Sequence, residues 1–295
     1  MKANIQDLIG NTPIIKLRRL AGGGAAEVYV KLEYLNPTGS HKDRIAYYMV
    51  RDAEEKGLIK PGDTMVEASS GNTAISVAWV SSLLGYRAEI FVEKGTSRIK
   101  IKLMKALGAK VVEAEEENYA EAARRYAEEN GYLFLNQYEN EANVRAHYET
   151  TGPEIYRQLG GRIDAFVMGI GTGGTISGVG RFLREKLGER VRIVGVVPRG
   201  SRIVGGEAAE RIEGLASDIV PGIWRRYSYV VDEVIEVGFD EALQTMKTLL
   251  RDEGILGGLS TGANVYAAMK VAEKLIKGVV VTIAPDTILR YPHLL

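Results

Sequence analysis

The chain has 295 residues, a length that suits two domains, each with its own hydrophobic core. Lysine and arginine (38) balance aspartate and glutamate (38), so the charge predicts neither a nucleic-acid partner nor an anionic membrane surface. The absence of cysteine excludes disulfides, thiolate metal sites and a cysteine nucleophile, and the three histidines lack the spacing of metal ligands, so we expect no metal.

Short apolar runs typical of strands alternate with amphipathic helical patterns along most of the chain. Strands are predicted at residues 28–32, 64–66, 88–92, 110–112, 133–135, 165–168, 192–197, 231–237 and 279–283. Helices are predicted at residues 45–55, 73–84, 98–107, 119–130, 154–159, 176–186, 239–252 and 263–277. Because the strands are almost continuously apolar, we expect parallel sheets covered by helices on both faces.

The strands are too many for one ordinary sheet, so the pattern predicts an α/β protein of two domains. We expect a smaller, mobile domain at residues 37–143 and a larger domain formed by residues 1–36 and 144–295, with a ligand bound between them. No apolar run approaches the ~20 residues of a membrane span, and residues 1–7 lack the apolar core of a signal peptide. We therefore expect a cytoplasmic protein without a membrane partner. Its abundance of Glu, Lys and Arg resembles thermophile usage.

Lys42 follows a turn and precedes a helical pattern. Pro37 and Gly39 favour the turn, and Ser40 is a preferred residue type for a helix N-cap. Lys42 is therefore expected in the first turn of the helix, where the helix dipole disfavours a positive charge. A lysine that is readily neutral suits Schiff-base chemistry, whereas the alternative is an ordinary solvated lysine.

A second cluster, Ser69-Ser70-Gly71-Asn72-Thr73, follows a predicted strand and begins a helix. Its small polar side chains and the free N–H groups at a helix N-terminus form an arrangement that suits an anion such as a carboxylate. The alternative is an ordinary helix cap, because serine and asparagine are preferred there.

A third cluster, Gly169-Ile170-Gly171-Thr172-Gly173-Gly174-Thr175, lies between a predicted strand and a predicted helix. Its glycines allow backbone N–H groups to approach a phosphate, and its threonines add hydroxyl donors. The glycine spacing also fits a dinucleotide site, which needs an acidic residue at the end of the next strand. That strand ends instead in Pro198-Arg199, and Arg199 would suit only the 2′-phosphate of NADP.

A fourth cluster, residues 257–263, places Ser260 in a glycine-flanked turn before a predicted helix. Alone, such a serine is usually a cap. It gains significance only as a member of a set with the other three clusters.

Together these segments resemble the cysteine synthase (O-acetylserine sulfhydrylase) and cystathionine β-synthase family of pyridoxal-phosphate enzymes of fold type II. The resemblance covers nearly the whole chain, through residues 9–13, 36–44, 70–73, 105–109, 136–138, 151–154, 171–175 and 257–262. It implies a fold like that of the tryptophan synthase β subunit, with the active site between two α/β domains, and a homodimer.

The resemblance also implies a role for each cluster. Lys42 matches the lysine that forms the internal aldimine with pyridoxal 5′-phosphate and then moves the α-proton. Asn72 matches the residue that binds the 3′-oxygen of the cofactor, and Ser260 matches the hydroxyl at its ring nitrogen. The cofactor phosphate is expected on Gly171, Thr172, Gly173, Gly174 and Thr175. The substrate carboxylate is expected on Ser69, Ser70, Gly71, Thr73 and Gln137.

The reaction implied is a β-replacement that makes L-cysteine from an activated serine, O-acetylserine or O-phosphoserine, and sulfide through an aminoacrylate intermediate. A hydroxyl at the ring nitrogen, unlike a carboxylate, cannot stabilise a protonated pyridine. Such a site suits concerted or nearly concerted β-elimination.

Three alternatives stay open. Asp218 resembles an aspartate of cystathionine β-synthases, which would use homocysteine with serine or an activated serine. Arg199, Arg202 and Arg211 either favour a phosphorylated donor or form a solvated basic stretch. A rival of another class is an NADP-binding or non-catalytic protein with this fold.

The chain departs from the usual family pattern at three places. Ala74 replaces a glycine after the second cluster, and His41 replaces an apolar residue beside Lys42. His41 is interpreted either as a packing residue or as a neutral neighbour of Lys42. Residues 286–291 differ from the usual family ending, a segment in which the resemblance implies cofactor contacts.

Overall fold

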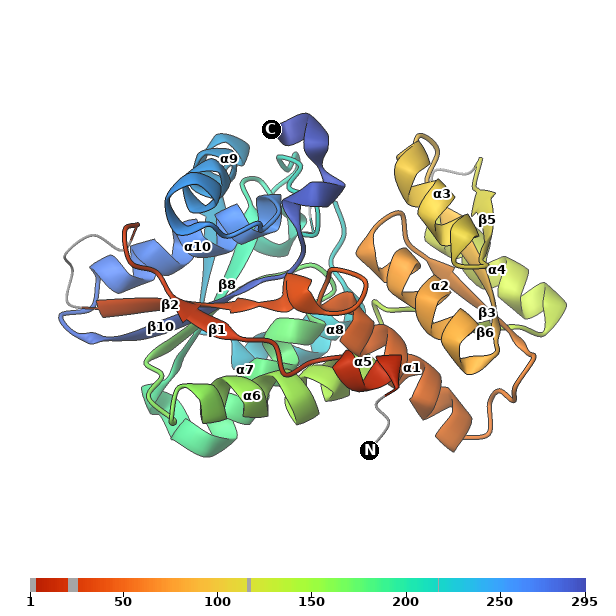
Figure 1. Cartoon of the computed structure of the whole chain (residues 1–295), viewed down its shortest axis with the longest axis horizontal. Helices are drawn as coiled ribbons and strands as arrows, with labels where there is room; N and C mark the ends of the chain where they lie inside the picture. The colour runs from red at the N-terminus through yellow and green to blue at the C-terminus, as the bar shows by residue number, and fades with distance from the viewer. Residues whose placement is uncertain (1–3, 21–25, 116–117, 217) are drawn as a thin grey trace. The chain divides into compact units, whose positions relative to one another are not determined.

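The computed structural model describes residues 4–20, 26–115, 118–216 and 218–295. The chain divides into two compact units, which are described separately. The larger unit contains Met1–His41 and Val144–Leu295, and the smaller unit contains Lys42–Asn143. Figure 1 labels their helices and strands.

The larger unit contains a six-stranded sheet in the order β1-β2-β10-β7-β8-β9. Its strands are β1 (Ile14–Lys16), β2 (Ala26–Leu32), β10 (Gly278–Ala284), β7 (Ala165–Gly169), β8 (Arg192–Pro198) and β9 (Glu233–Val237). β1 is antiparallel to β2, and the other neighbouring strands are parallel. Its helices include α6 (Gly152–Gln158), α7 (Gly174–Leu187), α8 (Gly222–Tyr227), α9 (Phe239–Thr248) and α10 (Leu259–Glu273).

Helices cover both faces of this sheet because alternate side chains of its strands point to opposite faces (Figure 1). Val167 of β7 belongs to a core that includes apolar residues of α9 and α10. Its neighbour Phe166 belongs to a second core that includes residues of α6 and α7. Strands buried on both faces explain the continuous apolar runs in the sequence.

The smaller unit contains a four-stranded parallel sheet in the order β5-β4-β3-β6. Its strands are β3 (Thr64–Ala68), β4 (Arg87–Val92), β5 (Lys110–Glu113) and β6 (Leu133–Phe134). Its helices include α1 (Lys42–Glu55), α2 (Asn72–Leu84), α3 (Arg98–Ala106) and α4 (Tyr119–Asn130). All five residues of β3 are buried, so the loop that follows this strand starts from a fixed position.

The predicted α/β class with mostly parallel sheets is confirmed, and each predicted strand is present with small shifts of its ends. The short strand β1 was not predicted, because three residues are too few to show a pattern. Residues 141–151 are helical: α5 (Glu141–Ala146) leads into a π-helix (His147–Thr151) and then into α6. The start of α10 is corrected from residue 263 to Leu259, so Ser260 lies in the first helical turn instead of a preceding turn.

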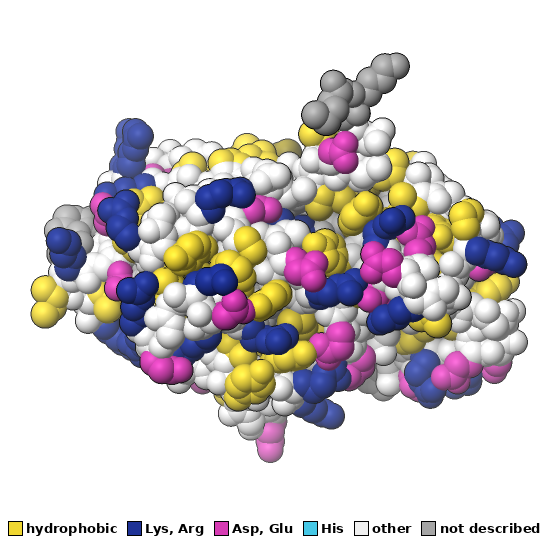
Figure 2. Space-filling model, turned by 90° about the horizontal axis from the view of Figure 1, so that it is seen from below, with side chains coloured by type: hydrophobic (Ala, Val, Ile, Leu, Met, Phe, Trp, Pro, Cys, Tyr) yellow, Lys and Arg dark blue, Asp and Glu magenta, His cyan; other side chains and the backbone are white. Residues whose placement is uncertain are grey.

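The surface carries both signs of charge. On the face shown in Figure 2, lysine and arginine side chains are interspersed with aspartate and glutamate side chains. Surface ion pairs of the smaller unit include Arg124 with Glu128 and Lys110 with Glu89. Among the described helices, none combines the length and the apolar character that crossing a membrane requires.

Candidate active site

The candidate residues of the larger unit gather where its parallel strands end. β2, β10 and β7 are neighbours, so their carboxyl ends meet at one edge of the sheet. The turn that precedes Lys42 follows β2, residues 285–291 follow β10, and the loop 169–175 follows β7. α10 precedes the parallel strand β10, which brings Ser260, in the first turn of this helix, to the same edge. Ligands of open α/β sheets bind at this edge.

The glycine-rich loop is shaped by close contacts. Gly173 precedes α7 with φ of 89°, a conformation that favours glycine. A Cβ added to Gly171 would lie only 2.6 Å from the carbonyl oxygen of Gly214, so residue 171 must be small. The hydroxyl oxygen of Thr172 accepts a 3.3 Å hydrogen bond from the N–H of Gly174. The loop therefore presents the N-terminus of a 14-residue helix, with threonine hydroxyls beside it, as an anion cradle.

Asn264 of α10 fixes the start of this loop. Its side-chain oxygen accepts a 2.8 Å hydrogen bond from the N–H of Gly169, and its side-chain nitrogen donates to the carbonyl oxygen of Ile283 at 2.9 Å. The asparagine is fully buried and joins α10 to the ends of β7 and β10. The sequence analysis missed it, although an asparagine inside an apolar helix is a usable signal.

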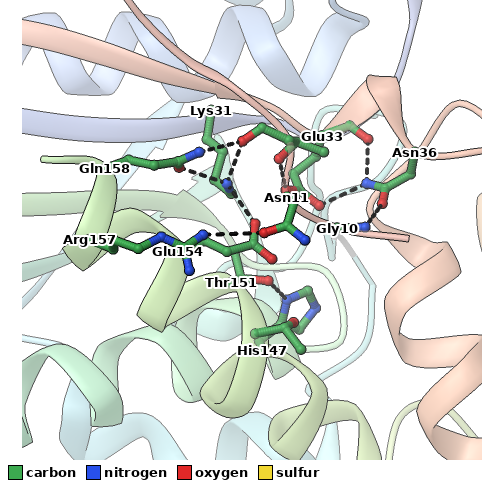
Figure 3. A network of polar contacts seen from close by, with 12 residues as sticks. Gly10, Asn11, Lys31, Glu33, Asn36, His147, Thr151, Glu154, Arg157 and Gln158 are labelled. Atoms are coloured by element: carbon green, nitrogen blue, oxygen red, sulfur yellow. Dashed lines mark hydrogen bonds and ion pairs between the residues drawn. The ribbon is translucent and has the colours of Figure 1, made fainter. Parts of the chain in front are cut away.

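Thr175 contacts a buried histidine. Its hydroxyl oxygen lies 3.1 Å from Nε2 of His147, and Nδ1 of His147 lies 2.9 Å from the hydroxyl oxygen of Thr151. Figure 3 shows the ring of His147 directed at Thr151. All three side chains are buried, so the last residue of the predicted phosphate loop belongs to an internal chain of polar groups.

Ser260 lies close to the same loop. A Cβ added to Gly214 would lie 3.6 Å from the hydroxyl oxygen of Ser260, and Gly214 also borders Gly171. The N–H of Ala216 donates to the carbonyl oxygen of Ile170 at 2.8 Å, which holds this segment against the loop. The structure thus brings Ser260 and the predicted phosphate loop together around Gly214.

A buried network supports the turn that leads to Lys42 (Figure 3). The side-chain nitrogen of Asn36 donates to the carbonyl and carboxylate oxygens of Glu33 at 2.7 and 2.9 Å, and its side-chain oxygen accepts from the N–H of Gly10 at 2.8 Å. Thr12 donates to Glu33 at 2.6 Å. Lys31 forms a 2.8 Å ion pair with Glu154 and donates to the carbonyl oxygen of Thr12. The opening motif at residues 9–13 therefore anchors the base of this turn.

Residues after β10 hold the other end of the turn. The backbone N–H of His41 donates to the carbonyl oxygen of Pro285 at 2.9 Å, and Nδ1 of the same histidine lies 3.2 Å from that oxygen. Ser40 pairs through its backbone with Asp286, and Arg290 donates to the carbonyl oxygen of Thr38. His41 is buried and tied to Pro285, which favours its interpretation as a packing residue.

The atypical segment 286–291 also supports the approach to Ser260. The N–H of Gly258 donates to the carbonyl oxygen of Asp286 at 3.0 Å, and Gly257 pairs through its backbone with Thr287. The segment that departs from the family ending therefore holds both the turn before Lys42 and the start of α10.

In the smaller unit, Lys42 is the first residue of α1, as the sequence predicted for the first turn. The next residue, Asp43, accepts a 2.6 Å hydrogen bond from the hydroxyl of Ser76, one turn after Asn72 on α2. Both side chains are buried. This bond, which the sequence did not indicate, fixes the start of α1 relative to the start of α2.

The predicted carboxylate cluster is ordered by hydrogen bonds at the carboxyl ends of β3 and β6. Thr73 donates to the side-chain oxygen of Gln137 at 2.6 Å, and the side-chain nitrogen of Gln137 donates to the carbonyl oxygen of Ala68 at 3.4 Å. The N–H of Gly71 donates to the hydroxyl oxygen of Ser69 at 3.3 Å. Ser70 accepts from the N–H of Glu93 at 2.9 Å.

Glu67 is a buried acid at the end of β3 that the sequence analysis missed. One carboxyl oxygen accepts a 3.0 Å hydrogen bond from the N–H of Ala68. Burial raises the pKa of Glu67 to about 8, against the opposing effects of the N–H groups of Ala68 and Gln137 and of the positive charge of Lys42. A carboxyl group that titrates close to neutrality beside a candidate site often marks function. The available signal was an acidic residue directly after the predicted strand at residues 64–66 and before Ala68.

Arg199 does not offer a free guanidinium group to a phosphate. It forms ion pairs with Glu210 at 3.1 Å and with Glu241 at 2.8 Å. This pairing disfavours both the NADP interpretation and a role for Arg199 in binding a phosphorylated donor. Within the described ranges, no group of three or more His, Asp or Glu side chains is arranged to hold a metal ion.

Comparisons with known proteins agree over nearly the whole chain. A family model described as pyridoxal-phosphate dependent enzyme matches residues 5–286. The chain is 43% identical to a cysteine synthase of Staphylococcus aureus, over 98% of this chain and 94% of that protein.

Solved structures give the same result. The crystal structure of an O-ureido-L-serine synthase has a TM-score of 0.93 and 39% identity, and the match covers 99% of this chain and 93% of that one. The cysteine synthase of Entamoeba histolytica has a TM-score of 0.93 and 32% identity, and the match covers 99% of this chain and 89% of that one. The chain therefore belongs to the family of pyridoxal-phosphate dependent enzymes that includes these cysteine synthases.

Proposed function

We propose that this protein makes L-cysteine from an activated serine and sulfide in a β-replacement reaction. The observation that carries the proposal is the 43% identity to a cysteine synthase over 98% of the chain. The anion cradle at the start of α7 and the hydroxyl of Ser260 beside it supply the geometric support. The cofactor is pyridoxal 5′-phosphate, as membership of the family requires.

The residues present fit this cofactor. The small residue 171, the left-handed Gly173 and the first turn of α7 leave room and N–H donors for a phosphate, which Thr172 and Thr175 supplement. In the proposal Asn72 binds the 3′-oxygen, Ser260 contacts the ring nitrogen, and Lys42 provides the amine that attaches the cofactor. When bound, the cofactor supplies an electrophilic carbon for amines and a sink for electrons released at the α-carbon of the substrate.

Lys42 moves the proton in the proposed reaction. Its Nζ takes the proton from the α-carbon of the donor as the bond between Cβ and the leaving oxygen breaks. Sulfide then forms the new bond to Cβ, and Nζ returns the proton to the α-carbon. The start of a helix favours the neutral amine that this role requires.

The Ser69–Thr73 cluster and Gln137 orient the donor by binding its α-carboxylate. Hydroxyls and helix N-terminal N–H groups suit this anion. The bond from Thr73 to Gln137 holds the two halves of the cluster in register, so the carboxylate meets a preorganised set of donors. Ser260 is neutral and does not stabilise a positive charge on the ring nitrogen, which suits elimination without a long-lived carbanion.

The close alternative is a cystathionine β-synthase that uses homocysteine. Identity at this level does not determine which nucleophile is used, since one solved relative at 39% identity is named as a synthase of O-ureido-L-serine. Rates measured for O-acetylserine, O-phosphoserine and serine, each with sulfide and with homocysteine, separate the two reactions. We expect the highest rate with sulfide and an activated serine. Inactivity of sulfide with every donor would contradict the proposal.

We also propose a cytoplasmic homodimer in which residues 37–143 move as the smaller domain. The match of the family model to residues 5–286 supports this organisation. Light scattering coupled to size exclusion measures the oligomeric state. Amide hydrogen exchange with and without an unreactive amino acid reports whether residues 37–143 respond as a unit.

A further inference from the structure

His147 lies at an unusual point of the fold. It begins the π-helix His147–Thr151, between α5 and α6, and is buried. π-Helical turns are rare and are frequent at functional sites. Its two ring nitrogens lie within hydrogen-bond distance of Thr151 and of Thr175. The reaction proposed above assigns no role to His147.

The backbone around His147 is held tightly against α7. A Cβ added to Gly178 of α7 would lie 2.4 Å from the carbonyl oxygen of Val144 and 2.8 Å from Cβ of His147. The two helical segments therefore touch backbone to backbone, one turn after Thr175. This contact holds the backbone of His147 close to α7, three residues from Thr175.

The protons shared by the side chains of Thr151, His147 and Thr175 can be counted. A neutral imidazole has one N–H group and one acceptor nitrogen, and each threonine hydroxyl has one proton. If the ring proton is on Nδ1, it is donated to Thr151, and the hydroxyl of Thr175 must donate to Nε2. If the ring proton is on Nε2, it is donated to Thr175, and Thr151 donates to Nδ1. Only the second order leaves the Thr175 proton for a ligand.

We propose that His147 is a positioning residue for the phosphate bound by the loop 171–175: its neutral ring carries the proton on Nε2 and turns the hydroxyl of Thr175 toward the phosphate. The inference rests on the proposed function in one respect, that this loop binds the cofactor phosphate. A bound phosphate favours the arrangement in which Thr151 donates to His147 and His147 donates to Thr175. The reason is that a fully ionised phosphate oxygen accepts hydrogen bonds and cannot donate them.

His41 provides an internal comparison. Its ring centroid lies 5.9 Å from that of His147, but its Nδ1 faces the carbonyl oxygen of Pro285 at 3.2 Å. A carbonyl oxygen only accepts, so neutral His41 carries its proton on Nδ1 whether or not phosphate is bound. The two neighbouring histidines are therefore expected to hold opposite tautomers in the holoenzyme.

Nitrogen-15 NMR of the histidine rings tests the tautomers directly. In the holoenzyme we expect His147 protonated on Nε2 and His41 protonated on Nδ1, with assignments made from His147→Gln and His41→Gln. Removal of the cofactor should change the signals of His147 and leave those of His41 in place. An Nδ1-protonated or doubly protonated His147 in the holoenzyme overturns the inference.

The apoenzyme separates this inference from the proposed function. Pyridoxal, which lacks the phosphate, and inorganic phosphate are added separately, and phosphate binding is followed by phosphorus-31 NMR. We expect phosphate alone to shift His147 to the Nε2 tautomer. If phosphate binds at Gly171–Thr175 and the His147 tautomer does not change, only the inference about His147 is contradicted. If the cofactor binds and its phosphate does not contact this loop, the proposed cofactor site itself is contradicted.

Cofactor affinity in variants gives an independent test. His147→Leu should weaken binding of pyridoxal 5′-phosphate about tenfold, and His147→Gln, whose amide can donate to Thr175, should recover most of the loss. In a Thr175→Val background, His147→Leu should have little further effect, because its target hydroxyl is gone. Additive losses in the double variant would indicate a purely structural role and overturn the inference.

Ser177→Ala is the matched control. Ser177 lies on α7 beside Gly178, and its buried hydroxyl has no hydrogen-bond partner among the described residues. Its removal should leave cofactor affinity and the His147 tautomer unchanged. A loss equal to that of His147→Leu would show that any change in the buried part of α7 disturbs the loop, and would count against a specific role of His147.

Discussion

The hydroxyl of Thr73 donates a 2.6 Å hydrogen bond to the side-chain oxygen of Gln137, although 64 residues separate them in the chain. The contact arises because β3 and β6 are parallel neighbours, which brings the loops after them to one edge of the small sheet. It also orients the amide of Gln137, whose nitrogen donates to the carbonyl oxygen of Ala68. The two parts of the proposed carboxylate site are therefore one hydrogen-bonded unit.

Thr73→Val should raise KM for the amino-acid donor more than it lowers kcat. The loss of one hydrogen bond in a buried cluster is worth about 1–2 kcal/mol, or roughly a tenfold change in KM. Steady-state kinetics with saturating sulfide measure it. Thr73→Ser keeps the hydroxyl and should behave almost as the wild type, whereas equal defects in the two variants would contradict the assignment.

Lys42→Ala should lower turnover by a factor of about 10³ or more, because it removes the amine that we propose to move the α-proton. Its visible absorption band should shift as well, since the variant lacks the proposed lysine attachment of the cofactor. Lys56→Ala is the control, because Lys56 is an exposed lysine close to the end of α1 that pairs with Asp52. A Lys42→Ala protein with wild-type turnover would remove the basis of the proposed reaction.

The buried Glu67 should make the stability of the protein fall with rising pH. Burial raises its pKa from 4.5 to about 8, so between these values the folded protein holds a proton that the unfolded chain has released. Stability is therefore lost as the pH rises from about 4.5 to about 8, and this loss is on the order of a few kcal/mol. Glu67→Gln keeps the shape without the titration and should flatten this dependence.

Urea unfolding of the wild type and of Glu67→Gln at pH 5, 6.5 and 8 measures the difference. Burial also raises the pKa values of the nearby Tyr119 and Tyr138, so these phenols stay neutral over the range. Glu93→Gln serves as a control at an exposed carboxylate. Parallel pH dependences for wild type and Glu67→Gln would show that Glu67 is not the titrating group.

Arg199→Met should leave the choice of donor unchanged. Because Glu210 and Glu241 already pair with Arg199, the ratio of kcat/KM for O-phosphoserine to that for O-acetylserine should stay within about twofold of the wild type. Stability should fall by about 1 kcal/mol or less, as is usual for exposed ion pairs. A selective loss of activity with O-phosphoserine would show that the guanidinium binds the donor phosphate.

Local patterns in the sequence were sufficient for every strand except β1, for most helices and for the loops that carry the candidate residues. Glycine, proline and small polar residues mark these loops because they meet local demands of backbone geometry. The helical segment at residues 141–151 was missed because His147 and Thr151 are buried polar residues where apolar periodicity would be expected. These two residues are buried because α7 packs against them, and the sequence alone does not show this contact.

Asn264 and Glu67 were missed for a related reason. Each acts through partners that are distant in the chain or supplied by the backbone, and a single sequence contains no record of such partners. The family resemblance indicated which segments carry the candidate site residues. It did not indicate the buried side chains that hold those segments in place.

The hydrogen bond between His41 and Pro285 spans 244 residues, and β10, the strand that positions Pro285, lies between β2 and β7 in the large sheet. During synthesis on the ribosome, the smaller unit can form its own sheet early, because the strands that it needs are complete by residue 134. The large sheet must wait for β10, and until then the turn before Lys42 lacks its anchor. The turn that leads into α1 is therefore completed only after nearly the whole chain has emerged, although it lies close to the N-terminus.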